Sequence, residues 1–200
     1  MRPYQQRALK FSYSLRFTIR IRTSVQELFL KFKAQELGDP QFEDRRLVLH
    51  TLPSISVDYS KWLHMQDVER LGLAARDLRS FWVHLDLQRR QIEEERGERK
   101  GQRNRLIQAV LAIQVDLQKL AHQINSQLRY LWSVASTRPL PCPLSGPTHS
   151  PPEKLLLLPQ FLPPETWCRR LQGYVILRDL ERYLAKLSRD FTLLKSRHGG

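Results

Sequence analysis

The chain has 200 residues, of which 41% are hydrophobic and 26% are charged. This composition is ordinary for a globular protein, and the length suits one sizeable core better than two, so we expect a single domain over residues 1–200. The longest purely aliphatic run covers only residues 155–158. Because a bilayer span needs roughly 18 to 20 apolar residues, we expect no membrane insertion.

The chain carries 33 Lys and Arg against 20 Asp and Glu, a formal net charge of +13. This surplus suggests nucleic acid or an anionic polysaccharide such as heparan sulfate as a partner, through counterion release. A nucleic-acid site, however, would gather its cations on one face or between stacking aromatic rings. Here they are scattered: residues 89–105 hold seven cations but also four acids. We therefore expect no specific nucleic-acid binding, and keep a basic helical nucleic-acid-binding protein or an intracellular helical scaffold as alternatives.

The N-terminal residues lack the apolar segment and small-residue cleavage site of a signal peptide. If the protein is exported, either a signal segment has been removed or export is unconventional. Six cations precede the first acid, Glu27, and such a start also fits a mitochondrial presequence. Both interpretations stay open at this point.

Prolines divide the chain, because proline lacks an N–H donor and clashes with the preceding turn of a helix. The twelve prolines lie at positions 3, 40 and 53 and then nine times between Pro139 and Pro164. A polar run with two glycines at 96–101 interrupts the longest proline-free stretch. Together these breaks predict four helices, at about 12–37, 63–95, 102–135 and 165–197.

The first predicted helix has an ambiguous start. Over residues 11–22, aromatic and β-branched side chains alternate with polar ones, which is the period of a strand. A strand needs a partner, and the candidate at 47–52 is short and is followed by Pro53. We therefore assign the stretch to the first helix, where helical spacing is clear from Ser24 to Leu37.

The other three segments each carry one apolar stripe with steps of three and four residues. At about 1.5 Å per residue they form rods of roughly 40 to 50 Å, which bury their stripes best against one another. The link near 96–101 is short, whereas those at 38–62 and 136–164 can run the length of a bundle. We predict an all-α fold: a long-chain four-helix bundle with up-up-down-down topology and two long crossovers.

No pattern typical of catalysis or metal binding is visible. His64, His84 and His122 lie in different segments without ligand spacing. Three consecutive glutamates, 93–95, point in different directions on a helix and sit in a charged run. The sequence has neither a glycine-rich phosphate loop nor a nucleophile elbow. We expect no enzyme activity, no cofactor and no metal site.

The chain has two cysteines, Cys142 and Cys168. Cys142 lies in the second crossover and Cys168 at the start of the last helix, so the two could approach. In an exported protein, a disulfide between them would tether the crossover to that helix. Two free thiols are the alternative.

Several runs near the first crossover and in the last helix carry a recognisable pattern. They are Leu37-Gly38-Asp39-Pro40-Gln41-Phe42, Thr51-Leu52-Pro53, Val57, Trp62, Asp67-Val68-Glu69-Arg70-Leu71, Cys168-Arg169-Arg170-Leu171-Gln172-Gly173-Tyr174-Val175 and Arg189-Asp190-Phe191-Thr192-Leu193-Leu194-Lys195. Their order and spacing resemble the ciliary neurotrophic factor branch of the interleukin-6 family, most strongly over 37–85 and 165–197 and weakly over 86–135. The resemblance implies a secreted cytokine that assembles receptor chains and activates JAK-STAT signalling. The implied chains are glycoprotein-130, the leukaemia inhibitory factor receptor and a ciliary neurotrophic factor receptor alpha-type chain.

The resemblance also implies three receptor-binding surfaces, of which the third lies at the start of the last helix. Neuropoietin-like members present a Phe-x-x-Lys pair there to the leukaemia inhibitory factor receptor, and the matching residues here are Trp167 and Arg170. In other branches a tryptophan near this position engages glycoprotein-130, so the receptor stays open. The alternative for Trp167 is that it packs the second crossover onto the bundle.

The other two surfaces are placed by position. The second surface uses the outer faces of the first and third helices, where Arg16, Arg20, Gln114 and Lys119 are the candidates. The first surface joins the end of the first crossover to the end of the last helix. Its candidates are Trp62, Arg189, Asp190 and Arg197. For each of these residues an ordinary solvated role is the alternative.

Overall fold

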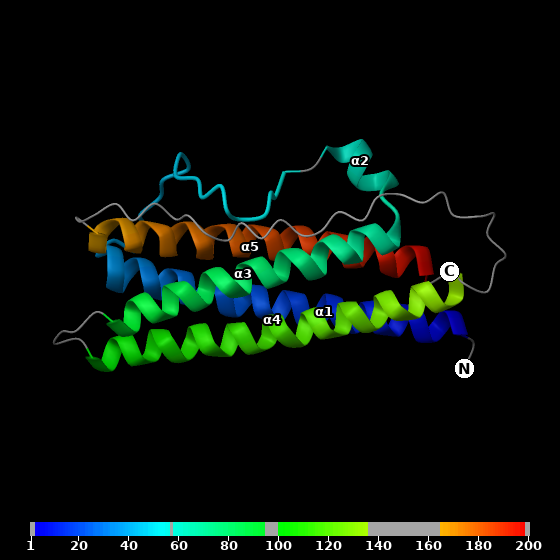
Figure 1. The fold of residues 1–200 in the computed structure, drawn as a ribbon, viewed down its shortest axis with the longest axis horizontal. Coiled ribbons are helices and arrows are strands. Elements are labelled where there is room, and N and C mark those ends of the chain that lie inside the picture. Colours follow the sequence, from blue (N-terminus) through cyan, green and yellow to red (C-terminus); the bar gives the residue numbers. More distant parts are fainter. Residues whose placement is uncertain (1–2, 57, 95–99, 136–164, 199–200) are drawn as a thin grey trace, which may run out of the picture.

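The computed structural model describes residues 3–56, 58–94, 100–135 and 165–198. These residues form helices and loops: α1 (Pro3–Phe32), the π-helical turn η1 (Lys33–Leu37), α2 (Tyr59–His64), α3 (Asp67–Glu94), α4 (Lys100–Ala135) and α5 (Glu165–His198). The four long helices lie side by side in an elongated bundle, and the short α2 lies on the connection that leads to α3 (Figure 1). The prediction of an all-α helical bundle is confirmed.

Helix α1 includes the stretch 11–22, so the period-two pattern there does not form a strand. The buried positions follow helical steps of three and four residues: Phe11, Ser14, Thr18, Ile21, Val25, Leu28 and Phe32. Two of them, Ser14 and Thr18, are polar, so the spacing of apolar residues alone does not reveal the buried face. The Thr18 hydroxyl donates to the Ser14 carbonyl at 2.8 Å, and the Ser14 hydroxyl accepts from Gln127 Nε2 of α4 at 2.8 Å. Because both hydroxyls are hydrogen-bonded, their burial is tolerated.

The predicted second helix, 63–95, corresponds to α3, and the short helix α2 lies mostly within the predicted crossover 38–62. Asp58 caps α2, since its carboxylate accepts from the backbone N–H of Lys61 at 3.0 Å. The backbone is extended at Met65, where ψ is 135°, and α3 starts at Asp67. An acidic residue in the first turn stabilises a helix through its dipole, which favours this start.

Ring contacts and ion pairs fix the directions of three helices. Phe11 lies 5.3 Å from the His198 ring and Phe29 lies 5.3 Å from the Tyr174 ring, so α1 runs antiparallel to α5. Arg70 pairs with Asp190 near the start of α3 and the end of α5, and Asp77 pairs with Tyr183 one step further along. Helix α3 is therefore also antiparallel to α5. The up-up-down-down topology stays a prediction, because its second crossover, 136–164, lies outside the described residues.

The first crossover lies along α5 (Figure 1). The Arg178 guanidinium donates to the carbonyls of Asp44 and Leu47, both at 2.8 Å. The Tyr174 hydroxyl accepts from the Asp44 backbone N–H at 3.1 Å, and the Phe42 ring packs edge-on against Tyr174 at 4.9 Å. These contacts hold the crossover on the bundle and deliver the chain to α2.

Gly173 marks the closest approach of α5 to its neighbours. A Cβ at this position would lie 2.5 Å from Phe32 Cζ of α1 and 2.7 Å from Gln88 Cδ of α3. Phe32 is 1% exposed and Gln88 is 5% exposed, so neither side chain has free space into which to move. The three helices can meet here only because the residue has no side chain.

We expect Gly173→Ala to destabilise the protein by about 1 to 3 kcal/mol, because the added methyl overpacks this contact. Urea unfolding followed by circular dichroism measures the change. Gly72→Ala is the matched control, since a Cβ at Gly72 of α3 meets nothing within 4 Å. That control should gain about 0.4 to 1 kcal/mol from reduced chain entropy. Equal effects of the two substitutions would contradict the close approach.

Candidate functional site

A buried ion pair closes one end of the bundle, where α3 begins and α5 ends. Arg70 Nη1 of α3 donates to Asp190 Oδ1 of α5 at 2.5 Å, and the two side chains are 2% and 3% exposed. Lys186 Nζ, one turn earlier on α5, lies 3.5 Å from Asp190 Oδ2. Buried charges are tolerated only when they are paired and hydrogen-bonded, and both conditions are met here.

Trp62 of α2 is fixed by this ion pair. Its indole Nε1 donates to Asp190 Oδ1 at 2.6 Å, and the Arg70 guanidinium lies over the ring at 5.1 Å from its centroid. Arg70 Nη2 also donates to the Trp62 carbonyl. The half-buried indole therefore has a single hydrogen-bonded position, with the guanidinium on its face.

A hollow of about 150 Å³ lies beside the ion pair, lined by residues of the crossover, α3 and α5: Pro53, Ser54, Trp62, Met65, Arg70, Leu73, Arg76, Asp77, Lys186 and Asp190. Next to it, the Tyr183 hydroxyl donates to Asp77 Oδ2 at 3.2 Å. Burial, together with the charge of Asp77, raises the pKa of Tyr183 well above 10. Tyr183 is therefore a neutral donor that compensates the buried Asp77 carboxylate.

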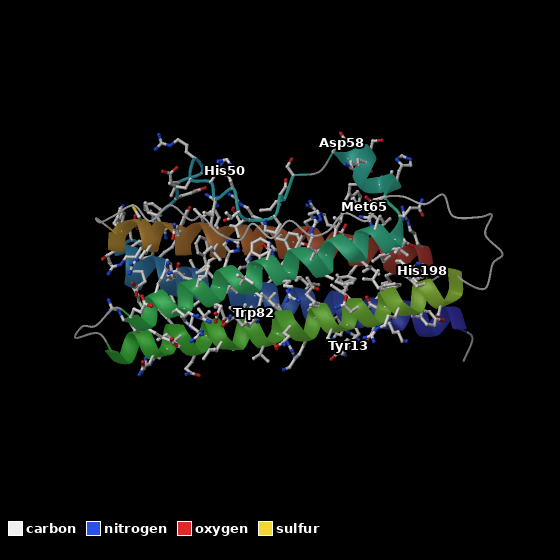
Figure 2. The ribbon with its side chains drawn as sticks, viewed as in Figure 1. Tyr13, His50, Asp58, Met65, Trp82 and His198 are labelled. Atoms are coloured by element: carbon white, nitrogen blue, oxygen red, sulfur yellow. The ribbon has the colours of Figure 1, made fainter. Side chains whose placement is uncertain are left out.

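A second cluster, at the C-terminal end of α5, holds the junction between α2 and α3. Arg197 Nη1 donates to Asp67 Oδ1 at 2.6 Å, and Arg197 Nη2 donates to the Leu63 carbonyl at 2.6 Å. His198 Nε2 forms a hydrogen bond with Asp67 Oδ2 at 2.8 Å. Met65 and His198 lie at the same end of the bundle in Figure 2.

The structure brings together three of the four residues predicted for the first surface: Trp62, Asp190 and Arg197. Their predicted exposure is only partly right, because Asp190 is 2% exposed and lies behind Trp62 instead of on the surface. Arg189 is exposed on the outer face of α5. Whether these residues bind a receptor stays a prediction.

Sequence reasoning missed two residues at this place. Arg70 fell between apolar positions of a predicted stripe, and nothing in the local sequence reveals its partner 120 positions away. Tyr59 is 71% exposed at the start of α2, with its ring centroid 6.0 Å from that of Trp62. An aromatic residue three positions before Trp62, on the same face of a helical turn, could have been noticed.

The second surface is only partly where the sequence predicted it. Arg16 and Arg20 are exposed on α1, and Lys119 is exposed on α4 beside Asp116, its partner at 3.6 Å. Gln114 was wrongly placed on an outer face: it is 3% exposed, and its amide donates to the Trp82 carbonyl of α3 at 3.4 Å. Glutamine is usually exposed, but here its hydrogen bond allows burial between two helices.

A shallow groove lies between α1 and α4, the two helices that carry the residues predicted for the second surface. It is lined by polar residue types that present mainly the carbon atoms of their side chains: Lys10, Tyr13, Ser14, His122, Gln123, Ser126 and Gln127. Tyr13 is 56% exposed there. The groove is wide open to solvent and does not enclose a small molecule, so it has the character of a contact surface.

The third surface contains an exposed tryptophan and a half-buried arginine. Trp167, in the first turn of α5, is 47% exposed. Arg170 Nη1 donates to the Glu36 carbonyl of η1 at 3.1 Å, and Arg170 Nε lies 3.4 Å from Glu36 Oε2. Cys168 is exposed between them. The predicted disulfide partner of Cys168, Cys142, lies outside the described residues, and so does the second crossover against which Trp167 would pack. Both hypotheses stay predictions.

The described residues contain no group of three His, Cys, Asp or Glu side chains placed to hold a metal ion. Among the helices that the structure describes, none combines the length and the apolar character that crossing a membrane requires.

Comparison with known proteins gives similarity over almost the whole chain. No model of a known protein family matches. The chain is 26% identical to cardiotrophin-2 of Pan troglodytes over 188 residues, and 27% identical to cardiotrophin-2 of Mus musculus over 190 residues. Each similarity covers 94% of this chain and 83% of the relative. These similarities confirm the resemblance to the interleukin-6 family of helical cytokines. The interpretation that a signal segment was removed, or that export is unconventional, is not confirmed.

We expect Asp190→Asn to cost about 3 to 5 kcal/mol in free energy of unfolding, because it leaves the Arg70 guanidinium buried without its countercharge. Urea unfolding measures the loss. Asp116→Asn is the matched control: it removes a carboxylate from a more exposed pair with Lys119 and should cost about 1 kcal/mol or less. Similar costs for both substitutions would show that the buried pair does not hold this end of the bundle.

Proposed function

We propose that this protein is a secreted cytokine that acts through cell-surface receptors. It bridges glycoprotein-130 and the leukaemia inhibitory factor receptor, and thereby activates JAK-STAT signalling. The observation that carries the proposal is the similarity to cardiotrophin-2 across 94% of a chain that folds as a helical bundle. A ligand of this kind acts by binding and needs no catalytic residues.

The separation of the surfaces along α5 supports receptor bridging. Trp167 lies in the first turn of α5 and Arg197 in its last turn. At about 1.5 Å per residue, the helix separates them by roughly 45 Å. Two receptor chains can therefore bind at opposite ends of one rigid helix without competing for space. The face of α1 and α4 with Arg16, Arg20 and Lys119 provides a third place.

The first surface suits a specificity receptor, such as a ciliary neurotrophic factor receptor alpha-type chain. Its exposed aromatic side chain is Tyr59, which lies beside Trp62. Trp62 in turn contacts the buried Arg70–Asp190 pair. Binding hot spots are typically aromatic or arginine side chains surrounded by well-packed neighbours, and this cluster has that composition. Arg189 adds an exposed cation on the adjacent face of α5.

The positive charge of the chain favours retention near the cell surface. With a net charge of +13, the protein is attracted to heparan sulfate and similar anionic polysaccharides. This attraction is long-range and weakens with salt, so it concentrates the ligand near its receptors without determining which receptor it binds.

The direct test uses cells that carry defined receptor combinations. Purified protein is added, and phosphorylation of the STAT transcription factors is measured. We expect a response on cells with glycoprotein-130 and the leukaemia inhibitory factor receptor, and none on cells that lack glycoprotein-130. No response on any combination that contains glycoprotein-130 would overturn the proposed function.

We expect Trp167→Ala to weaken binding to the leukaemia inhibitory factor receptor about 30-fold or more, the loss typical of an aromatic hot spot. The melting temperature should stay nearly unchanged, because the side chain is half exposed at a helix end. Trp132→Ala is the matched control, since Trp132 is a 62% exposed tryptophan of α4 outside the three surfaces. Unchanged affinity of the Trp167 variant, or its failure to fold, would favour a packing role for this side chain.

A further inference from the structure

Helix α1 ends in an unusual way, and this ending buries a carboxylate. The five residues that follow it, Lys33–Leu37, form the π-helical turn η1, and Gly38 comes next in a left-handed conformation with φ of 75°. Glu36 lies within this turn and is only 6% exposed. A single π turn accommodates an extra residue and is rare in helices, and such turns occur frequently at functional sites.

Arg170 of α5 pairs with this carboxylate and with the backbone beside it. Arg170 Nη1 donates to the Glu36 carbonyl at 3.1 Å, and Arg170 Nε lies 3.4 Å from Glu36 Oε2. The planar guanidinium can contact two acceptors at fixed angles, which a lysine ammonium does less well. Glu36 therefore contacts Arg170 in two ways: its carbonyl accepts a hydrogen bond, and its carboxylate lies within ion-pair distance of the guanidinium.

The surrounding packing makes this contact rigid. Phe32, just before η1, packs against Gly173, one turn after Arg170, so the end of α1 cannot slide along α5. Because Glu36 is nearly inaccessible, it makes no direct contact with a partner of the protein. Arg170 keeps 28% of its side chain exposed, and Trp167 lies three residues earlier, on the same face of the helix.

We infer that Glu36 is a positioning residue of the third surface, an inference that rests on the proposed function. Its carboxylate compensates the charge of Arg170 and sets the direction of the guanidinium. The exposed part of Arg170 then stands next to Trp167 in one fixed arrangement. The surface offers a receptor a pre-organised aromatic side chain beside a neutralised arginine, and binding loses less side-chain entropy as a result.

The first test is Glu36→Gln, which keeps the size of the side chain and removes its charge. We expect about ten-fold weaker binding to the leukaemia inhibitory factor receptor, measured by surface plasmon resonance, with binding to glycoprotein-130 unchanged. Glu27→Gln is the matched control, because Glu27 is an exposed acid of the same helix. It should leave both affinities unchanged.

The second test separates positioning from simple charge. Arg170→Lys keeps the positive charge but cannot reproduce the forked contact with Glu36. We expect this variant to lose about ten-fold in affinity as well, and Glu36→Gln to add less than two-fold in the Arg170→Lys background, since both changes break one contact. Full additivity of the two losses would mean that the residues act separately, and would overturn the inference.

The outcomes distinguish this inference from the proposed function. Wild-type protein that binds neither receptor chain contradicts the proposed function itself. Wild-type protein that binds the leukaemia inhibitory factor receptor, with Glu36→Gln of equal affinity, contradicts only the role of Glu36. If circular dichroism shows that Glu36→Gln does not fold, Arg170→Lys decides: wild-type affinity of that variant overturns the inference, and the ten-fold loss supports it.

Discussion

The buried ion pair between Arg70 and Asp190 is the interaction on which one end of the bundle depends. Removing both charges from water is costly, and the cost is offset only because Trp62 and Lys186 also contact the carboxylate. If α3 moved along α5 by one turn, about 5.4 Å, each charge would be left buried without its partner. The pair thus selects one register of the two helices, and through Trp62 it selects one position for α2.

Helix α5 positions α1, η1, α3 and the first crossover through contacts spaced along its length. Near its start, Arg170 is hydrogen-bonded to η1, and Gly173 allows α1 and α3 to approach α5 closely. In its first half Arg178 holds the first crossover, and near its end Asp190 and Arg197 hold α2 and the start of α3. Polar contacts define the register at each point, while the apolar core between them supplies most of the stability. Segments far apart in sequence are thereby placed on one helix.

The helices were predictable where apolar spacing alone defines them, as in α4 and α5. Helix α1 was ambiguous because Ser14 and Thr18 occupy buried positions of its stripe. The Thr18 hydroxyl bonds to the Ser14 carbonyl one turn earlier, but the burial of Ser14 depends on Gln127, more than 100 positions away, and no local pattern contains that information. Helix periodicity therefore predicts a buried face well when long apolar runs of its positions remain, as in α4 and α5, and poorly when polar residues interrupt it near the helix start, as in α1.

The candidate surfaces were predictable as regions but not residue by residue. The pairing of crossover and last helix that brings Trp62 near Asp190 was expected from position, yet the sequence could not tell which side chain would be buried. Asp190 and Gln114 look like surface residues by type, and only their long-range hydrogen bonds reverse that expectation. A polar side chain belongs on the surface only if it has no hydrogen-bond partner in the core. Whether it has one depends on the fold, so the sequence alone does not show it.

The two ends of α5 share one arrangement, which bears on how a ligand of such high charge can be selective. At each end a tryptophan, Trp62 or Trp167, accompanies an arginine whose charge is compensated by a carboxylate from another element: Asp190 for Arg70 and Glu36 for Arg170. Charge that is compensated internally contributes little to long-range attraction. Receptor binding at these two places, as proposed above, would then depend on the apolar contact of an aromatic ring, and it should vary less with salt than the net charge of the chain suggests. In the proposed function, attraction to polyanions would rest on the uncompensated cations elsewhere on the surface, and specific binding would rest on the two tryptophan–arginine places.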